Sequence, residues 1–591
     1  MRRALPILLA VAGLCAPAAV AQAAPPPAPP VKGLSAPART TTAGPPTVTA
    51  ADLRFTPGRV LRDGTPQQAG LSPDAVAAIG KDAASYMNSA PTPYYPGAVV
   101  LAARNGVVAA QDAMGYALRY ADDKPTELPR DQWIPMRKDT IFDLASMSKL
   151  FTTVAAIQQI ERGRIDLNAT VASYLPGFGQ NGKDTITIRE LLTHTSGLRP
   201  DLPFYNYSGR AAQEAALFAD TPQATPGTAY IYSDLNMITM QFVLEKVTGK
   251  TLDVLVRDGI TRPLGMRDTG YNPPASEKPR IAATEYEHKP YAALDRGLVW
   301  GQVHDENSYA LGGVAGHAGV FSTAHDIGIF AQMILDGGRY GHARVLDEDS
   351  VRLLFTDFNT AFPGNAHGLG FEIGLRWYED AMTSPVTIGH TGYTGTSIVI
   401  DPISRSFVIL LTNRVHPTRN GPSINPARRA VARDLGRAVP VRPAEGRDAW
   451  FSQMADGKTA TLTAPIAGAA KLSFDLWYDT EETDLGVLET SSDGKTWTPA
   501  PLSLRSGRNA WTVNGAFSGF AGRRWAKATA TLPAGTTSVR WRYTSDPAYQ
   551  GRGVYVDGVR AWDADGHVVF NGERPADAAR FQPAGWVLSS N

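Results

Sequence analysis

Two kinds of hydrophobic pattern open the first large region of the chain. The apolar run 98–103 is followed by Asn105-Gly106 and a second apolar run, and Asn-Gly between two such runs predicts a β-hairpin. Apolar residues then recur at helical spacing over 141–162, where Gly163 ends the pattern. The sequence therefore predicts a hairpin followed by a long helix.

The later part of this region returns to strands. Helical spacing recurs twice and predicts helices over 236–247 and 325–335. Strand-like runs follow and predict strands over 371–374, 396–401 and 406–412. Strands at both ends enclose the helices, so we expect an α+β domain in which both ends contribute to one sheet. We place this domain over residues 51–440.

The last quarter of the chain has a different texture. From about residue 445 it consists of short β-rich runs separated by turn signals, and residues 538–543 alternate with period two. Eight of the eleven tryptophans fall here, at positions 450, 477, 497, 511, 525, 541, 562 and 586. These patterns predict a second domain over residues 445–591, an all-β sandwich.

The N-terminal residues have the pattern of a signal peptide followed by a linker. Arg2 and Arg3 precede an apolar stretch that ends in the small-x-small pattern Ala21-Gln22-Ala23, so we expect a signal peptide over 1–23 and a secreted protein. Residues 24–50 are rich in Ala, Pro and Thr, which predicts a disordered linker. No later run reaches the ~18 apolar residues of a membrane span.

Composition excludes several classes of function. The 57 basic and 56 acidic side chains nearly cancel, whereas a nucleic-acid binder usually carries a basic excess. The single cysteine excludes a disulfide scaffold and a Cys-rich zinc site. The histidines show no metal-ligand spacing and no phosphate-binding loop is present, so we expect no metal and no cofactor.

The main chemical clue is Ser146-Met147-Ser148-Lys149 near the start of the predicted 141–162 helix. A serine hydroxyl needs a neighbour that takes its proton, and the i to i+3 spacing brings the Lys149 amine within reach of Ser146. Alone, the motif leaves two interpretations open: an activated nucleophile, or a serine that merely starts a helix.

Two further motifs follow in order: Tyr232-Ser233-Asp234 and His390-Thr391-Gly392. Together with Ser-x-x-Lys they resemble the active-site elements of serine β-lactamase-like hydrolases, the family of class C β-lactamases, DD-peptidases and related esterases. The resemblance runs from about residue 65 to 440 and includes Leu-Leu-Thr-His-Thr-Ser-Gly at 191–197.

The resemblance implies an α+β fold with an antiparallel sheet flanked by helices plus a helical region, and it implies a role for each motif. Ser146 would be the acylated nucleophile, Lys149 its proton partner and Tyr232 the acid/base at the leaving group. The oxyanion hole would be the backbone N–H groups of Ser146 and Tyr393, and His390 would occupy the place of the substrate-anchoring cation, beside Thr391 and Gly392.

The chain departs from the family pattern at two positions. Asp234 stands where Asn is usual, and we expect its carboxylate to favour the ammonium form of Lys149 and to shift base work to Tyr232. His390 stands where lysine is common, and a histidine with an ordinary pKa near 6.5 is only partly cationic at neutral pH. The second departure weakens a β-lactamase interpretation more than a peptidase one.

A third signature combines residues 303–307, the Gly-rich run 312–319 and residues 412–417. It is similar to a penicillin-binding-protein-like subgroup of cell-wall hydrolases, some of which act as muramyl-peptide amidases. His304 and Asp305 would then line the substrate groove. The alternative is a structural Gly-rich loop.

Four segments carry a second resemblance: residues 472–478, 492–497 (Ser-Asp-Gly-Lys-Thr-Trp), 542–546 and 554–557. They are similar to the jelly-roll domains of immune-inhibitor-type secreted peptidases, which often bind carbohydrate or protein surfaces. Its tryptophans either stack on sugars or fill the core. Its acidic residues either hold calcium or belong to a solvated loop; they are Asp479, Glu481, Glu482 and Asp484.

These observations predict a secreted serine hydrolase that acts through a Ser146 acyl-enzyme on a small amide or ester. The best guess for its activity is a D-Ala-D-Ala carboxypeptidase or a related cell-wall peptide hydrolase. A carboxylesterase or muramyl-peptide amidase is the first alternative. A slowly acylating penicillin-binding or sugar-adhering protein, holding cell-wall or carbohydrate surfaces through 445–591, is the second. The sequence leaves the acyl donor and the oligomeric state open.

Overall fold

The computed structural model describes residues 44–56, 58–89 and 92–590. The predicted signal peptide and the linker as far as residue 43 lie outside the described residues. The end of the predicted linker, however, is packed: the Asn509 amide donates to the Gly44 carbonyl (3.2 Å), and Val48 lies against the core of the first domain. The predicted linker boundary at residue 50 is therefore several residues too late.

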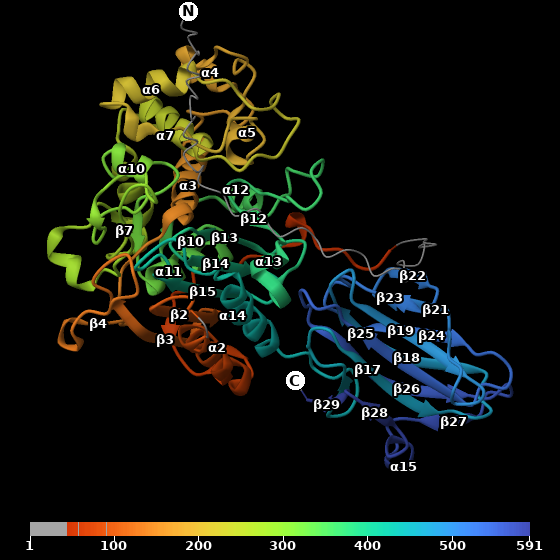
Figure 1. The fold of residues 1–591 in the computed structure, drawn as a ribbon. Coiled ribbons are helices and arrows are strands. Elements are labelled where there is room, and N and C mark those ends of the chain that lie inside the picture. The colour runs from red at the N-terminus through yellow and green to blue at the C-terminus, as the bar shows by residue number, and fades with distance from the viewer. Residues whose placement is uncertain (1–43, 57, 90–91, 591) are drawn as a thin grey trace, which may run out of the picture.

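The first domain is built on one mixed sheet (Figure 1). Its main path runs β1-β3-β2-β15-β14-β13-β12, and β4 pairs with β3. All neighbours are antiparallel except β1 and β3. The strands are β1 (Arg62–Asp63), β2 (Gly97–Arg104), β3 (Val107–Leu118), β4 (Ile134–Pro135), β12 (Glu372–Ile373), β13 (Ile388–Gly392), β14 (Thr396–Asp401) and β15 (Ser406–Thr412). Both ends of the domain contribute strands, as predicted.

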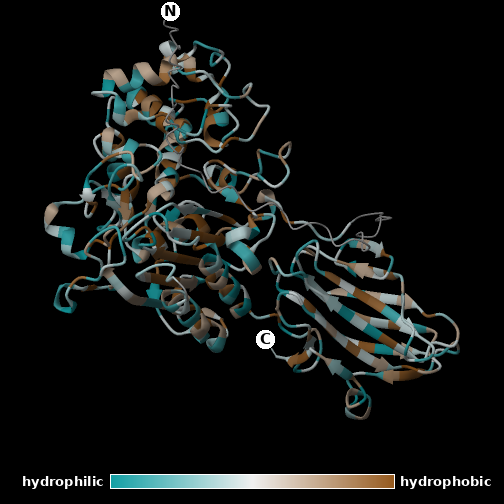
Figure 2. Ribbon diagram, viewed as in Figure 1, coloured by the Kyte–Doolittle hydropathy of each residue, from teal (hydrophilic) through white to brown (hydrophobic). Residues whose placement is uncertain are grey.

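The central strands are apolar throughout because both of their faces are covered. In β2, Val99 and Leu101 face one core cluster, whereas Ala98 and Val100 face another. Helices α2 (Pro73–Ser85) and α14 (Asn425–Ala438) pack on the second face, and α11 (Ala324–Leu335) packs on the first. Figure 2 shows the resulting concentration of hydrophobic residues along these strands.

A helical region lies beside the sheet and carries part of the site. Its main helices are α3 (Ser148–Glu161), α5 (Ile188–Leu192), α6 (Arg210–Ala219) and α7 (Asp234–Thr248). The predicted helix over 141–162 begins too early: residues 142–143 form strand β5 (Phe142–Asp143), which pairs with β9 (Val320–Ser322), and a 3₁₀ turn, η4 (Ala145–Met147), precedes α3. A strand partner more than 170 residues away overrides the local helical pattern. Among the described residues, no helix is long and apolar enough to cross a membrane.

Residues beyond α14 form two antiparallel sheets around a shared core. One follows β22-β21-β24-β18-β26-β16-β29 with β27 beside β26, and the other follows β20-β19-β25-β17-β28 with β23 beside β19. Along β25 (Ser538–Thr544), buried Val539, Trp541 and Tyr543 alternate with half-buried neighbours. All eight tryptophans are buried or half-buried, which agrees with core filling. The jelly-roll connectivity stays a prediction. The remaining strands are β16 (Ala449–Phe451), β17 (Thr459–Pro465), β18 (Lys471–Asp479), β19 (Leu485–Ser491), β20 (Thr498–Pro499), β21 (Leu502–Ser506), β22 (Asn509–Val513), β23 (Ala516–Phe517), β24 (Ala526–Thr531), β26 (Gly553–Trp562), β27 (Val568–Asn571), β28 (Gln582–Ala584) and β29 (Val587–Ser589).

Of the four acidic residues for which the sequence leaves calcium binding open, Glu481 and Asp484 lie together and form a group of potential metal ligands with Asp546, whereas Asp479 and Glu482 are outside this group. Asp479 accepts a hydrogen bond from the Arg523 guanidinium (2.8 Å), and Asp484 accepts one from the Tyr543 hydroxyl (2.9 Å). Glu481 and Asp484 lie near Asp546, whereas Glu482 is exposed. The four predicted residues therefore do not form one group.

Candidate active site

Ser146 lies in the 3₁₀ turn η4, directly before α3. The preceding residue, Ala145, has a left-handed backbone (φ 47°), a conformation that costs of order 1–3 kcal/mol in a non-glycine residue. The Asp143 side chain holds this turn by accepting a hydrogen bond from the Ala145 N–H (2.8 Å). The local fold therefore fixes where the Ser146 hydroxyl points.

Lys149 brings the motif together, as its spacing predicts. Its ammonium donates to the Ser146 hydroxyl (2.9 Å) and lies 2.8 Å from the Asp234 carboxylate. It also donates to the His317 carbonyl (3.3 Å). The lysine is 1% exposed, so these contacts are shielded from water.

Tyr232 stands on the other side of the same lysine. Its ring centroid is 4.8 Å from the Lys149 nitrogen, and the Lys149 ammonium and the Ser146 side chain both lie close enough to affect the pKa of its phenol. His194 fixes the tyrosine: its carbonyl accepts from the Ile231 N–H (2.9 Å), its Nδ1 accepts from the Ser233 N–H (3.1 Å), and its ring lies 4.6 Å from the Tyr232 ring.

These contacts set the charges of the site. Burial disfavours the Lys149 ammonium, but the Asp234 carboxylate and Tyr232 outweigh burial and raise the lysine pKa above its ordinary value. Burial raises the pKa of Tyr232, and the neighbouring Lys149 ammonium offsets part of that rise. Lys149 is therefore a cation, and this agrees with the effect expected from Asp234.

The hairpin between β13 and β14 lies against the nucleophile segment. The Thr394 hydroxyl donates to the Asp143 carbonyl (2.7 Å), and the Thr396 hydroxyl donates to the Leu144 carbonyl (3.0 Å). Gly392 must be glycine, because a Cβ there would meet the Leu144 carbonyl oxygen at 2.3 Å. Tyr393 follows Gly392 in this hairpin, so the two N–H groups assigned to the oxyanion hole belong to adjoining segments.

His390 differs from the expectation of a partly cationic anchor. It lies on β13, is 1% exposed, and its Nδ1 donates to the Thr391 carbonyl (2.8 Å). Burial, reinforced by the Lys149 ammonium, lowers the pKa of His390 to about 3. The imidazole is therefore neutral at neutral pH and does not supply the positive charge of an anchoring lysine.

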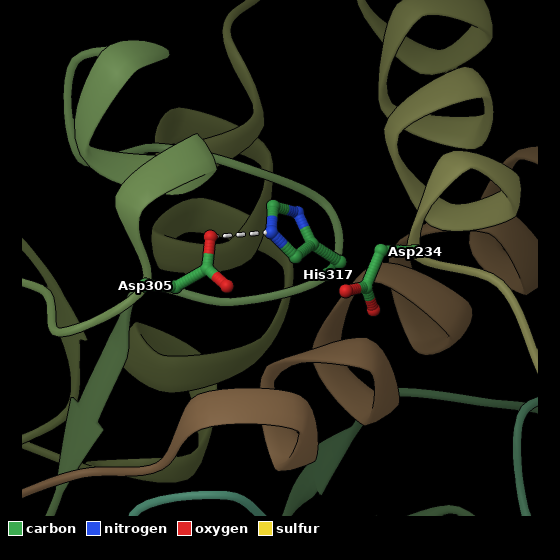
Figure 3. A group of neighbouring side chains, drawn as sticks. All are labelled: Asp234, Asp305 and His317. Atoms are coloured by element: carbon green, nitrogen blue, oxygen red, sulfur yellow. Dashed lines mark hydrogen bonds and ion pairs between the residues drawn. The ribbon is translucent and has the colours of Figure 1, made fainter. Parts of the chain in front are cut away.

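Asp234, Asp305 and His317 lie close to one another (Figure 3). The His317 Nε2 pairs with the Asp305 carboxylate (2.8 Å), and one potential ligand atom from each residue lies within 4.8 Å of the others. Burial opposes a charge on His317, but Asp305 and Asp234 raise its pKa above the ordinary value. Both carboxylates have a basic partner: Asp234 pairs with Lys149, and Asp305 pairs with His317.

His304 and Asp305 lie at the site in a different way from that predicted. His304 is 3% exposed, and its ring pairs with the Glu285 carboxylate (2.8 Å). Its backbone N–H donates to the Asp143 carboxylate (2.6 Å). Its ring stacks with Tyr393 at a centroid distance of 5.8 Å. His304 therefore supports the hairpin residue and does not line a groove, whereas Asp305 is 30% exposed.

Several residues of the site escape the motif search. Asp143 and Ala145 shape the nucleophile turn, His194 holds Tyr232, and Glu285 fixes His304. His194 belongs to the run 191–197, and His317 belongs to the Gly-rich run 312–319. The spacing of residues in these runs does not predict that His194 contacts Tyr232 or that His317 contacts Lys149.

Known proteins are similar to the first domain of this chain. The family described as Beta-lactamase matches residues 89–433. A relative from Salmonella paratyphi B (strain ATCC BAA-1250 / SPB7), named "Putative D-alanyl-D-alanine carboxypeptidase", is 34% identical over 361 residues, which cover 56% of this chain and 82% of the relative.

Two solved structures are also similar. A novel penicillin-binding protein homolog from Caulobacter crescentus is 20% identical with a TM-score of 0.48, covering 61% of this chain and 97% of the other. A class C β-lactamase is 19% identical with a TM-score of 0.49, covering 63% of this chain and 98% of the other.

Proposed function

Since this chain belongs to the Beta-lactamase family and is a serine hydrolase, we propose that it removes the C-terminal D-alanine of cell-wall peptides through an acyl-enzyme on Ser146. The observation that carries the acyl-enzyme is the buried contact of 2.9 Å between the Lys149 ammonium and the Ser146 hydroxyl, with Asp234 on the far side of the lysine. The relative that carries a D-alanyl-D-alanine carboxypeptidase name supports the substrate class.

The charges of the site determine the separate roles of Ser146, Lys149 and Tyr232 in the proposed mechanism. Lys149 is a cation and donates to Ser146, so it cannot accept the serine proton. Tyr232 takes that proton as its phenolate and returns it to the leaving amine. The adjacent Lys149 ammonium favours the phenolate, but burial outweighs it and keeps the pKa of the phenol above its ordinary value, so only a small fraction of the enzyme is in this form at neutral pH. The tetrahedral oxyanion forms between the N–H groups of Ser146 and Tyr393. Water then attacks the acyl-enzyme by the same proton route.

Intact-mass analysis tests the nucleophile. The wild type, Ser146→Ala and Ser148→Ala are each incubated with a fluorophosphonate and, separately, with a penicillin. Ser148 is a matched control, because it belongs to the same motif but its hydroxyl accepts a hydrogen bond from the Val320 N–H (3.0 Å). We expect one fluorophosphonate adduct on the wild type and on Ser148→Ala and none on Ser146→Ala. A persistent adduct on Ser146→Ala would refute the assignment.

A carboxylesterase is the second candidate, and one observation favours it. The neutral His390 leaves β13 without the cation that usually binds a substrate carboxylate. Release of D-alanine from an acyl-D-Ala-D-Ala peptide separates the two functions: the carboxypeptidase proposal requires it, and an esterase hydrolyses short nitrophenyl esters without it. A penicillin adduct in the mass experiment would also favour the peptidase.

We further propose that the protein is exported. The two arginines, apolar stretch and small-x-small pattern of residues 1–23 support the proposal. The N-terminal sequence of protein recovered from the culture medium of the native host tests it. A start at Ala24 is expected, and intact Met1 on the cytoplasmic protein alone would contradict it.

A further inference from the structure

A short segment of the first domain is held by the C-terminal sandwich. It joins β12 to β13 and contains helix α13 (Arg376–Glu379) and the 3₁₀ turn η9 (Asp380–Met382). Figure 1 shows α13 on the side of the first domain that faces the sandwich. The Arg376 guanidinium donates to two sandwich carbonyls, those of Thr480 (3.1 Å) and Gln550 (3.4 Å). Arg376 therefore connects the start of α13 to the second domain.

The end of the same segment is connected to the sandwich as well. Arg433 of α14 pairs with Asp380 (2.9 Å) and with Asp456 of the sandwich (3.2 Å). Arg523 of the sandwich donates to the Thr383 carbonyl (3.1 Å). Asp380 has a left-handed backbone (φ 45°), which is unfavourable for a residue other than glycine and persists where the surrounding contacts impose it. The two domains together therefore fix the shape of this segment.

Tyr378 of this segment packs on the strand that carries His390. It is fully buried in the core cluster on the second face of the first domain's sheet. Its hydroxyl oxygen lies so close to Gly389 of β13 that a Cβ at that position would meet it at 2.6 Å. Glycine at position 389 thus allows Tyr378 to contact the backbone of β13 directly.

Gly389 lies behind the catalytic face of β13. Side chains alternate between the two faces along a strand, so positions 390 and 392 face away from Tyr378. On that side the His390 ring lies 6.2 Å from the Tyr232 ring, and Gly392 lies against the Leu144 carbonyl. Tyr378 therefore supports β13 from the face opposite to the catalytic residues.

The contact between Tyr378 and Gly389 depends on shape and not on charge. The Tyr378 hydroxyl has no hydrogen-bond partner among the described residues, and neither carboxyl oxygen of Glu379 has one. Burial raises the pKa of Glu379 well above its ordinary value, so this neighbouring carboxyl is uncharged at neutral pH. The edge of the Tyr378 ring also lies 2.8 Å from the position of a Cβ at Gly389, so the ring itself supports the strand.

We propose that Tyr378 is a positioning residue for the reaction and that the sandwich, through Arg376, holds Tyr378 in place. Because packed interiors transmit displacements, a shift of Tyr378 moves β13 relative to the Ser146 segment and changes the geometry in which the oxyanion is bound. The inference rests on the proposed Ser146 acyl-enzyme but not on the substrate, since it applies to peptide and ester acyl donors alike. It gives the C-terminal domain a role in catalysis.

Arg376→Gln tests the connection without opening the core, because Arg376 is only half-buried. We expect kcat for a neutral nitrophenyl ester to fall about fivefold while KM changes less than about twofold, because a displaced oxyanion hole weakens binding only in the transition state. Arg580→Gln is the matched control: its guanidinium donates to the Pro465 carbonyl (3.2 Å) within the sandwich. Unchanged kcat in Arg376→Gln, or an equal loss in the control, would overturn the proposal.

A double variant tests whether Arg376 acts through Tyr378. Tyr378→Ala removes the ring and is expected to lower kcat about 20-fold, whereas Tyr378→Phe keeps the ring and most of the rate. The double variant of Arg376→Gln and Tyr378→Ala is expected to lose no more activity than Tyr378→Ala alone, because effects that share one path are not additive. Losses that multiply would show two independent effects and contradict the proposal.

Hydrogen exchange locates the effect and does not depend on whether Tyr378→Ala folds. In Arg376→Gln the amides of β13 are expected to exchange faster than in the wild type. Strand β2, which β14 and β15 separate from β13, is expected to exchange as before, whereas a general loss of stability would change both strands. A fall in kcat without faster exchange in β13 would place the effect elsewhere and refute the positioning role.

Two further measurements separate this inference from the proposed function. Fluorophosphonate titration normalises each rate to the number of reactive serines, and a wild type that is not labelled at Ser146 would overturn both proposals. If the wild type releases no D-alanine from an acyl-D-Ala-D-Ala peptide but ester kcat depends on Arg376 and Tyr378 as described, the carboxypeptidase proposal fails and the positioning role stands. D-alanine release that is equal in the wild type and in Arg376→Gln would leave the carboxypeptidase proposal standing and overturn the positioning role.

Discussion

At the scale of single residues, the departure from the family pattern at Asp234 determines which group takes the Ser146 proton in the proposed mechanism. Asp234 lies 2.8 Å from the Lys149 ammonium and holds the lysine charged beside the nucleophile. The same carboxylate raises the pKa of the Tyr232 phenol. Both effects delay the loss of a proton from the site as the pH rises.

Asp234→Asn is therefore expected to move the acidic limb of the pH–rate profile to lower pH, by about one unit. Without the carboxylate, the pKa of Lys149 and the pKa of Tyr232 both fall, so the group that must lose its proton does so earlier. The measurement is kcat/KM for a neutral nitrophenyl ester between pH 5 and 10. Asp258→Asn is the control, since its carboxylate pairs with Arg257 at the surface (3.0 Å). An acidic limb that stays in place, or moves upward, would contradict this account.

At the scale of elements, two threonines join the hairpin to the nucleophile segment. Thr394 is buried, and its hydroxyl bonds to the Asp143 carbonyl next to the strained turn at Ala145. In the proposed mechanism the oxyanion hole takes one N–H from each segment, so this bond would set the distance between its two donors. Misplacement by 1 Å costs an enzyme on the order of 100-fold in rate.

Thr394→Val is expected to lower kcat about tenfold or more while KM changes little, because the oxyanion is bound only during reaction. The loss of the bond also lowers the free energy of unfolding by about 1–2 kcal/mol. Thr536→Val is the matched control: its buried hydroxyl donates to the Pro533 carbonyl (2.7 Å) in the C-terminal sandwich. Steady-state kinetics and denaturant titration compare the two. Similar stability losses with similar kcat losses would show that Thr394 acts only on stability.

The elements were predictable where local pattern and tertiary contacts agree. Strands 396–401 and 406–412 match β14 and β15, because their apolar runs are buried on both faces. The start of α3 was not predictable, because β5 is a strand only through its pairing with β9. Neighbours along the chain contain no information about that partner.

The site shows the same limit. The contact between Ser146 and Lys149 follows from i to i+3 spacing, which the sequence displays. The burial of His390 and the pairing of His304 with Glu285 depend on segments that meet only in the fold. The charge of a histidine depends on such surroundings. The sequence shows that a histidine stands at position 390, but it does not predict whether that histidine is protonated.

At the scale of the whole molecule, the C-terminal sandwich is joined to the first domain by buried ion pairs. Arg523 is 5% exposed and contacts Asp401 of the first domain (2.6 Å) and Asp479 of the sandwich (2.8 Å). It also donates to the carbonyls of Met382 and Thr383 (3.1 Å each). A carbohydrate- or wall-binding role for residues 445–591 is a proposal. The domain to which it applies contacts the first domain through Arg523.

This interface changes what a deletion of residues 445–591 would report. The deletion removes Arg523 and leaves the Asp401 carboxylate, which is 2% exposed, without its cationic partner. A lower rate in the truncated enzyme would then reflect a damaged catalytic domain as well as a lost binding surface. A point substitution at the interface separates these effects.

Arg523→Gln is expected to uncouple the two domains. Breaking one partner of a buried ion pair costs about 3–5 kcal/mol, because the remaining carboxylates stay buried without compensation. Calorimetry should then show two unfolding transitions in place of one, with the first at a lower Tm. Arg505→Gln, an exposed arginine on β21, is the control and should leave the profile unchanged. A single transition at the wild-type Tm in Arg523→Gln would mean that the domains are held together by other contacts, such as the Arg433 and Asp456 pair (3.2 Å).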